Sequence, residues 1–314
     1  MPNKVSRRSF LQSSSMAGAG LAALAPLSAS EKKTYQKGAS PWPICLNTSS
    51  IRPATLDKKI EAAVAAGYDG IELWIDELEN YEKEGGKLEE LGKRLTDLGL
   101  FVPNAIGLWG AIPADPAQWE ASLAPTRNRM RMMAAAGSQH AACIPPGKPA
   151  DVDRKWCAQC YRDLVKIGRD EYGISVAFEF VGFMESIYRF GDAAGIAIDA
   201  NIPEACLIMD TFHLYRGGSG FEGIRHVRGP FIADFHINDV PAEPPREEMS
   251  DKHRIYPGDG ILPLASVFQQ LKEIGYEGPL SVEMFNEEHY AQEPQIVAET
   301  ALRKTLEVIK ASGV

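Results

Sequence analysis

The sequence predicts an α/β protein folded as a single (β/α)8 TIM barrel, and three observations support that fold class. From Trp42 onward, short apolar runs alternate with longer amphipathic segments, which is typical of repeated β–α units and a parallel sheet. The apolar runs lack regularly alternating polar residues, so each strand is expected to be buried on both faces. Residues 41–314 are long enough for one barrel of this kind.

Eight apolar runs are predicted to be the strands, and amphipathic segments between them to be helices. The predicted strands cover residues 44–47, 70–74, 101–106, 140–144, 175–179, 206–210, 231–236 and 280–283. The predicted helices cover residues 55–66, 88–98, 119–136, 156–172, 264–274 and 294–311. Five of these helices stop at a glycine before the next strand, and glycine is common just after a helix C-terminus.

An open, doubly wound parallel sheet is the alternative fold. That fold usually carries a glycine-rich phosphate-binding turn after its first strand, whereas residues 47–50 here are Asn-Thr-Ser-Ser. The formal net charge of −9 argues against a nucleic-acid partner, because contact with a phosphate backbone needs a positive surface.

The first 30 residues are predicted to be a twin-arginine signal peptide. Lys4, Arg7 and Arg8 form a positive start, an uncharged stretch rich in Ala, Gly and Leu follows, and small residues at 28–30 suit cleavage. The run Ser-Arg-Arg-Ser-Phe-Leu at 6–11 resembles the twin-arginine export motif, and an ordinary Sec signal is the alternative. The stretch is too short and too weakly apolar for a membrane span. We expect a polar linker at residues 31–40, a catalytic domain at 41–314 and export to the periplasm.

Four consecutive predicted strands end in a side chain that can bind a metal. The fifth strand ends in Glu179, the sixth in Asp210, the seventh in His236 and the eighth in Glu283. The C-terminal ends of the strands carry the active site in this fold, so these side chains are expected to meet there. We predict that they bind one divalent metal ion, and three oxygen donors with one nitrogen suit Mn²⁺, Mg²⁺, Co²⁺ or Zn²⁺.

The alternative is a buried hydrogen-bonded cluster that holds no metal. Three carboxylates and one imidazole would then lie within a few ångströms of one another, and like charges so close cannot all stay ionised without a cation. No Lys or Arg ends a neighbouring predicted strand to offset them. The charge balance therefore favours a bound divalent ion.

A metal with open coordination positions can polarise a carbonyl and an adjacent hydroxyl of a polyol. It would stabilise the enediolate that forms when a carbon-bound proton leaves. One nearby carboxylate can take the proton and a second can return it elsewhere. Glu179 and Glu283 are predicted to be this catalytic pair.

Five further residues are predicted to contact the substrate. His213 lies just after the sixth strand and Arg254 lies in the long loop after the seventh, where a structural histidine and a surface arginine are the alternatives. Asn47 and Glu72 come from the first two strands and are expected to line the pocket. Trp109 is expected to stack on a sugar ring, although burial in the core is the commoner place for tryptophan.

Five short motifs occur in a specific order along the chain. They are Phe-Glu-Phe-Val-Gly at 178–182, Asp-Thr-Phe-His at 210–213, His-Ile-Asn-Asp at 236–239, the segment 254–260 and Ser-Val-Glu at 281–283. Their order resembles that of the xylose-isomerase-like TIM barrels, a family of sugar and polyol isomerases and epimerases that also contains endonuclease IV. Within it, the inosose isomerase branch is the most similar. The resemblance implies the same four metal ligands, the same two catalytic glutamates, and substrate contacts by His213 and Arg254.

These features predict a metal-dependent isomerase or epimerase that acts on a keto-polyol or keto-sugar, such as an inosose, through a metal-stabilised enediolate. The alternative is an exported lyase or hydratase that acts on 3-keto-glycosides, with the same proton abstraction followed by β-elimination. An endonuclease is disfavoured because the first three strands end in Asn47, Trp74 and Ile106, with no nearby histidine for a three-metal cluster. The complete ligand set disfavours a non-catalytic binding protein, and assembly into a homo-oligomer is left open.

Overall fold

A computed structural model describes residues 34–314, and the predicted signal peptide at residues 1–30 lies outside this part. In residues 34–314, eight parallel strands close into a barrel in sequence order, with β8 paired to β1. The strands are β1 Ile44–Asn47, β2 Gly70–Trp74, β3 Val102–Leu108, β4 Ser138–Cys143, β5 Ser175–Glu179, β6 Cys206–Asp210, β7 Ile232–Ile237 and β8 Leu280–Val282. The predicted (β/α)8 TIM barrel is confirmed.

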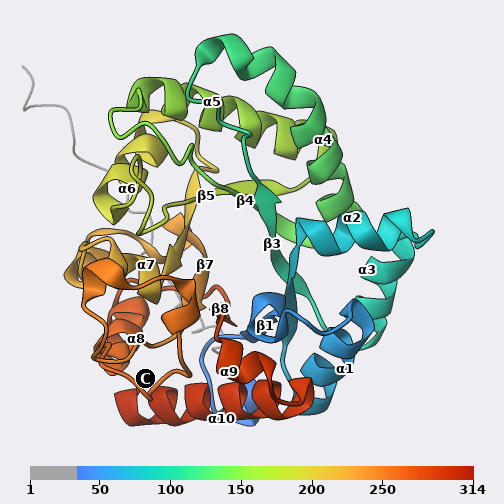
Figure 1. The fold of residues 1–314 in the computed structure, drawn as a ribbon, viewed down its shortest axis with the longest axis vertical. Helices are drawn as coiled ribbons and strands as arrows, with labels where there is room; N and C mark the ends of the chain where they lie inside the picture. Colours follow the sequence, from blue (N-terminus) through green and yellow to red (C-terminus); the bar gives the residue numbers. More distant parts are fainter. Residues whose placement is uncertain (1–33) are drawn as a thin grey trace, which may run out of the picture. The chain divides into compact units, whose positions relative to one another are not determined.

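Helices surround the barrel on its outer side (Figure 1). The α-helices of the described residues are α1 Leu56–Ala66, α2 Ile75–Lys83, α3 Leu88–Asp97, α4 Trp119–Ala135, α5 Arg154–Ile167, α6 Phe190–Asp199, α7 Thr211–Arg216, α8 Leu264–Glu273, α9 Glu287–Tyr290 and α10 Pro294–Ser312. A π-helical turn, Gly168–Tyr172, continues α5 to the predicted end of that helix. The long α10 packs against both α1 and α8 and so completes the helical layer.

Helices α2, α6, α7 and α9 are additional to those that the hydrophobic pattern predicts. Both α2 and α7 begin at the residue after a strand ends, so strand and helix form one continuous stretch in the sequence. The third, α6, contains Gly191 and Gly195, and glycine lowers intrinsic helix propensity. The fourth, α9, is too short to show a helical period.

The predicted bounds are confirmed for β1, β2, β5 and β6, and the other strands differ at one or both ends. Strand β3 continues through Gly107 to Leu108, with a shift of register against β4. Gly107 has a φ of 151°, and a Cβ there would lie 2.2 Å from the side chain of Ile75. The strand can therefore continue toward the barrel mouth only with glycine at this position.

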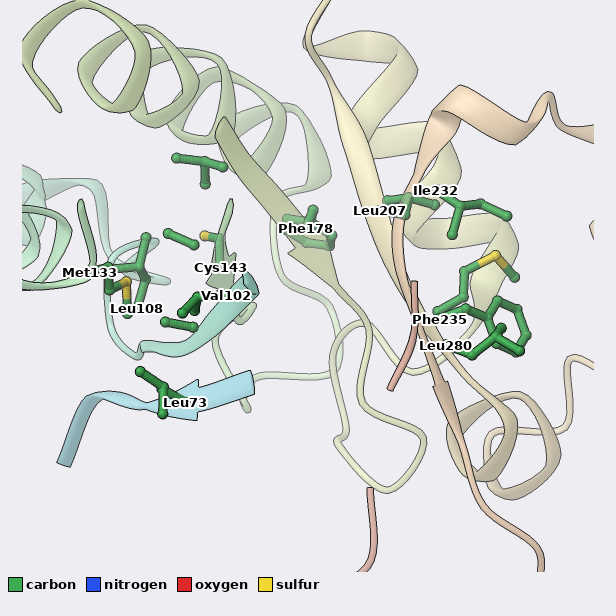
Figure 2. Close-up of a cluster of buried hydrophobic side chains, with 14 of the residues drawn as sticks. Leu73, Val102, Leu108, Met133, Cys143, Phe178, Leu207, Ile232, Phe235 and Leu280 are labelled. Carbon is green, nitrogen blue, oxygen red and sulfur yellow. The ribbon is translucent and has the colours of Figure 1, made fainter. Parts of the chain in front are cut away.

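Alternation of side chains along the strands separates the outer core from the barrel interior. On β5, Phe178 points outward into the large core that Figure 2 shows in part, whereas Ala177 points inward. The interior core consists of Ile106, Ala142, Ile144, Ala177, Val181, Cys206, Ile208 and Ala233. Glu179 and Asp210 follow Ala177 and Ile208 by two residues, so their side chains face inward where the strands end.

Residues 35–40, which the sequence places in a linker, are attached to the barrel. Tyr35 forms an isolated antiparallel bridge with Ser40, around the 3-10 turn Gln36–Gly38. The Gln36 side chain donates hydrogen bonds to Asp69 Oδ2 at 2.7 Å and to the Gly67 carbonyl at 3.0 Å. Within residues 34–314, none of the helices combines the length and the apolar character needed to cross a membrane.

The buried hydroxyl of Tyr161 offers a test of how α5 is joined to the sheet. It donates to the carbonyl of Cys206 at 2.8 Å or Val176 at 2.9 Å, and it accepts from the Cys206 amide at 3.0 Å. Tyr161→Phe would remove the acceptor of the buried Cys206 amide and a donor to the two carbonyls, so we expect a loss of about 1–3 kcal/mol in the free energy of unfolding, measured with urea. The control is Tyr81→Phe, which removes a hydroxyl from a half-buried tyrosine on α2, away from this contact. Equal losses in the two variants would contradict this assignment.

Candidate metal centre and active site

The four side chains predicted as metal ligands meet at the mouth of the barrel. His236 on β7 is the register partner of Asp210 on β6 and of Ser281 on β8. Glu283 lies two residues after Ser281, just past the end of β8. Glu179 ends β5 on the other side of β6. The four side chains belong to residues that are at most 4% exposed. The register of the sheet therefore brings them together, as the sequence predicts.

Three carboxylates surround one ring nitrogen of His236. Its Nδ1 lies 3.2 Å from Glu283 Oε2, 3.4 Å from Glu179 Oε1 and 3.8 Å from Asp210 Oδ2. The other ring nitrogen, Nε2, is 3.0 Å from Glu72 Oε1, and this hydrogen bond favours the tautomer with its proton on Nε2.

This arrangement fits a bound divalent cation. Nδ1 of His236 is buried and has no hydrogen-bond partner in the described part of the chain. In the neutral tautomer, its lone pair faces carboxylate oxygens, which are also electron donors. The candidate ligand atoms of Asp210, His236 and Glu283 lie within 4.8 Å of one another, as do those of Glu179, Asp210 and His213. A cation among these donors would satisfy all of them at once.

Arg254 reaches the same group of carboxylates from the loop after β7. Its Nη1 donates to Asp210 Oδ2 and to Glu283 Oε2, both at 2.6 Å, and its side chain is 1% exposed. The sequence places no arginine at a neighbouring strand end, and this guanidinium arrives instead from a loop. It supplies one positive charge against the three carboxylates of Glu179, Asp210 and Glu283, so a net negative charge remains for a metal to neutralise.

Glu72 lies beneath the ligands and positions one of them. Besides accepting from His236, it accepts hydrogen bonds from Asn47 Nδ2 at 2.7 Å, Asn104 Nδ2 at 2.7 Å and Ser281 Oγ at 2.5 Å. Asn47 also donates to Glu283 at 3.2 Å. The sequence predicts that Glu72 and Asn47 contact the substrate, but both are fully buried and neither lines the pocket. Their inward side chains come from β1 and β2 and support the ligands from below.

Burial and neighbouring charges shift the pKa values of the two carboxyl groups that Arg254 contacts in opposite directions. Burial raises the pKa of Glu283 to about 7, against the lowering effects of His236 and Arg254. Burial would also raise the pKa of Asp210, but Arg254 and His213 outweigh it and hold that pKa well below its usual range. Burial alone would lower the pKa of His236, yet Glu72 and Glu283 raise it well above its usual value. Protons and a metal cation therefore compete for Glu283 and His236.

A pocket of about 140 Å³ opens onto this centre. Glu179, Glu283 and three predicted substrate contacts, His213, Arg254 and Trp109, line it. The rest of its lining is apolar except for Asp251, and consists of Trp74, Ile106, Ile144, Val181, Phe183, Met184 and Phe285. Such a pocket suits a ligand whose oxygens face the metal ligands while its carbon skeleton contacts aromatic rings.

Several residues that build this pocket were not predicted from the sequence. Asp251 fixes Arg254 through hydrogen bonds at 2.6 and 3.0 Å, and its position three residues before Arg254 was an available signal. The guanidinium carbon of Arg254 also lies 4.7 Å from the ring centroid of Phe212 and 5.1 Å from that of Phe285. Phe183 and Phe285 follow β5 and β8 in loops, where no periodic pattern identifies them.

The contact between Glu72 and His236 predicts how metal affinity depends on Glu72. In Glu72→Gln, the amide oxygen can still accept from Nε2, but the negative charge that makes the ring a stronger ligand is lost. We expect metal affinity to fall by about 10–100-fold, measured by calorimetry with Zn²⁺ or Mn²⁺. Glu61→Gln, an exposed change of the same kind on α1, is the control. Unchanged affinity in Glu72→Gln would show that Glu72 does not tune the ligand.

The competition with protons predicts the pH dependence of metal binding. The raised pKa values of Glu283, about 7, and of His236 mean that both groups hold protons that the metal must displace. Apparent affinity should therefore rise with pH and fall about tenfold per pH unit below 7 for each proton displaced. Calorimetry in buffers of different ionisation enthalpy measures both the affinity and the protons released. Affinity that is constant between pH 5.5 and pH 8.5, with no proton release, would contradict this prediction.

Comparison with known proteins identifies relatives over most of the chain. The alignment with inosose isomerase of Bacillus subtilis is 32% identical over 141 residues, 45% of this chain, and the chain spans about half the length of that relative (50%). The alignment with inosose isomerase of Bacillus velezensis is 26% identical over 275 residues, 85% of this chain and 96% of the relative. A crystal structure of the IolI protein with a bound zinc atom superposes with a TM-score of 0.78 at 24% identity, covering 86% of this chain and 99% of the other.

Other relatives carry related activities. L-ribulose 3-epimerase of Methylomonas sp. is 26% identical over 243 residues, 74% of this chain and 79% of that protein. 3-Dehydroshikimate dehydratase of Pseudomonas putida is 24% identical over 256 residues, 80% of this chain and 39% of that protein. The relatives are thus isomerases and epimerases of sugar-like compounds, together with a dehydratase.

Residues 60–311 match the sequence profile described as the xylose isomerase-like TIM barrel. With this match, the closed barrel and the resemblance of its motifs, the chain belongs to the xylose isomerase-like TIM barrel family.

Proposed function

We propose that this protein is a metal-dependent isomerase or epimerase of a keto-polyol or keto-sugar, of the size of an inosose. The observation that carries the proposal is the convergence of Glu179, Asp210 and Glu283 on the unpartnered Nδ1 of His236, at the floor of a small pocket. The inosose isomerase and ribulose epimerase relatives support this class of substrate. The zinc atom bound to the IolI protein supports a divalent ion as the cofactor.

The residues of the chain divide the chemistry among them. A divalent ion held by the four ligands would polarise the substrate carbonyl and stabilise the negative charge that develops as a neighbouring carbon loses its proton. One carboxylate of the pair Glu179 and Glu283 takes this proton, and the other returns a proton to the adjacent carbon or to the opposite face.

Two further side chains are placed to hold the substrate. His213 Nε2 and Arg254 Nη2 lie 3.3 Å apart, and both residues line the pocket. Arg254 already donates to Asp210, Asp251, Glu283 and His213, so a substrate oxygen would bind it by replacing one of these partners. The rings of Phe212 and Phe285 keep the guanidinium in place. The apolar lining excludes water from the carbon that loses its proton.

A lyase or hydratase acting on 3-keto-glycosides is the second candidate. The dehydratase relatives and the apolar part of the pocket favour it, since a leaving group needs room beside the reacting ring. Loss of a β-substituent would follow the same proton abstraction. Export by the twin-arginine route, which we infer from residues 1–30, would place either activity in the periplasm, where glycosides are met.

Exchange of carbon-bound hydrogen tests the proposed reaction. We expect the protein loaded with Mn²⁺ or Zn²⁺ to incorporate deuterium from D₂O into an inosose or a ketohexose, detected by NMR. Glu283→Gln removes one proton-transfer group, so the rate of exchange should fall by at least about 10²-fold. Glu287→Gln on the nearby α9, an exposed residue, is the matched control. The absence of deuterium from every inosose and ketohexose tested would refute the isomerase, and release of an aglycone from a 3-keto-glycoside would identify the lyase.

A further inference from the structure

A second hollow of about 370 Å³ adjoins the pocket, and Phe183 and Met184 line both. We call it the arginine groove, because Arg189, Arg216 and Arg246 line it. The pocket alone is smaller than the range of about 300–1,000 Å³ typical of small-molecule sites, whereas the pocket and groove together fall within that range. A substrate larger than one ring would therefore extend past Phe183 into the groove.

The charge of the groove contrasts with that of the whole chain. Three arginines and one acidic residue, Glu247, line the groove, and Glu247 forms an ion pair with Arg246. An excess of positive charge therefore remains there, in a protein whose formal net charge is −9. Guanidinium groups present planar pairs of N–H donors that match the oxygens of a carboxylate or a phosphate. The groove is therefore complementary to an anionic group and not to another neutral sugar.

Local structure keeps these guanidinium groups at the groove. Arg216 donates from Nε and Nη2 to the carbonyls of Met249 and Glu247, both at 2.8 Å, which fixes its position. Gly218 leaves room for Arg246, because a Cβ there would lie 2.8 Å from Arg246 Nη1. Arg189 makes no ion pair with an acidic residue in the described part of the chain, so it can pair with a ligand.

We propose that the arginine groove binds an anionic group carried by the substrate, a carboxylate or a phosphate, while the keto-sugar ring occupies the pocket. This inference rests on the proposed function, since it extends the same site. The substrate class is then a keto-sugar that carries a carboxylate or a phosphate, in place of a neutral polyol.

Binding of matched probes to the metal-loaded protein tests the proposal without any need for turnover. The probes are methyl glucoside, methyl glucuronide and glucose 6-phosphate, compared by NMR titration at one ionic strength. We expect one or both anionic probes to bind at least about tenfold more tightly than the glucoside, and the stronger of the two identifies the group. This preference should shrink as salt rises from about 0.05 to 0.5 M.

The double variant R189Q/R246Q should lose most of the preference. The control R127Q/R303Q removes the same charge from two exposed arginines elsewhere, which pair with Glu171 and Glu307, and should keep it. Thermal unfolding confirms that both variants are folded. Equal affinity of the wild type for all three probes would overturn the proposal, and so would a preference that persists in R189Q/R246Q, since the anion would then bind at the metal or Arg254. Neither result bears on deuterium exchange, so a failure here is distinguishable from a failure of the proposed function.

Discussion

Repulsion among buried carboxylates is the constraint on which the rest of the site depends. Glu179, Asp210 and Glu283 approach the same imidazole nitrogen while almost wholly removed from solvent. Charges of one sign in such a place raise each other's pKa or require a cation, and Arg254 supplies only part of the compensation. A site that binds a divalent ion turns this unfavourable arrangement into an affinity for the metal. In the function that we propose, the same ion would make proton abstraction from a bound ketone feasible.

The barrel makes this arrangement possible because alternate side chains along each strand point into its interior. Small and aliphatic side chains fill the interior below the mouth, so inward positions at the strand ends project side chains into a shared space. A second polar layer lies directly beneath, where Glu72 accepts four hydrogen bonds and orients His236. Glu72, which does not line the pocket, thus holds the imidazole of His236 in one orientation, as a proposed metal ligand requires.

Most of the barrel and all four proposed ligands could be predicted from the sequence, because each ligand lies within one residue of the end of a largely apolar strand. Glu72 could not be distinguished from a pocket residue, since its place on β2 gives its direction but not its depth beneath the mouth. The contact of Arg254 with the ligands also escaped prediction, because a long loop brings it there and loops carry no periodic signal. The arginine groove escaped prediction as well, because its residues come from the loops after β5 and β7 and from the C-terminal end of α7, which are far apart in the sequence. Helices α2 and α7 were hidden because they continue their strands without a break.

The most direct test of the central claim is anomalous X-ray diffraction from crystals of the protein grown with Zn²⁺ or Mn²⁺. The account predicts a single strong anomalous peak bounded by His236 Nδ1 and the carboxylates of Glu179, Asp210 and Glu283. A well-ordered mouth with no anomalous density, or density bound by other residues, would contradict it.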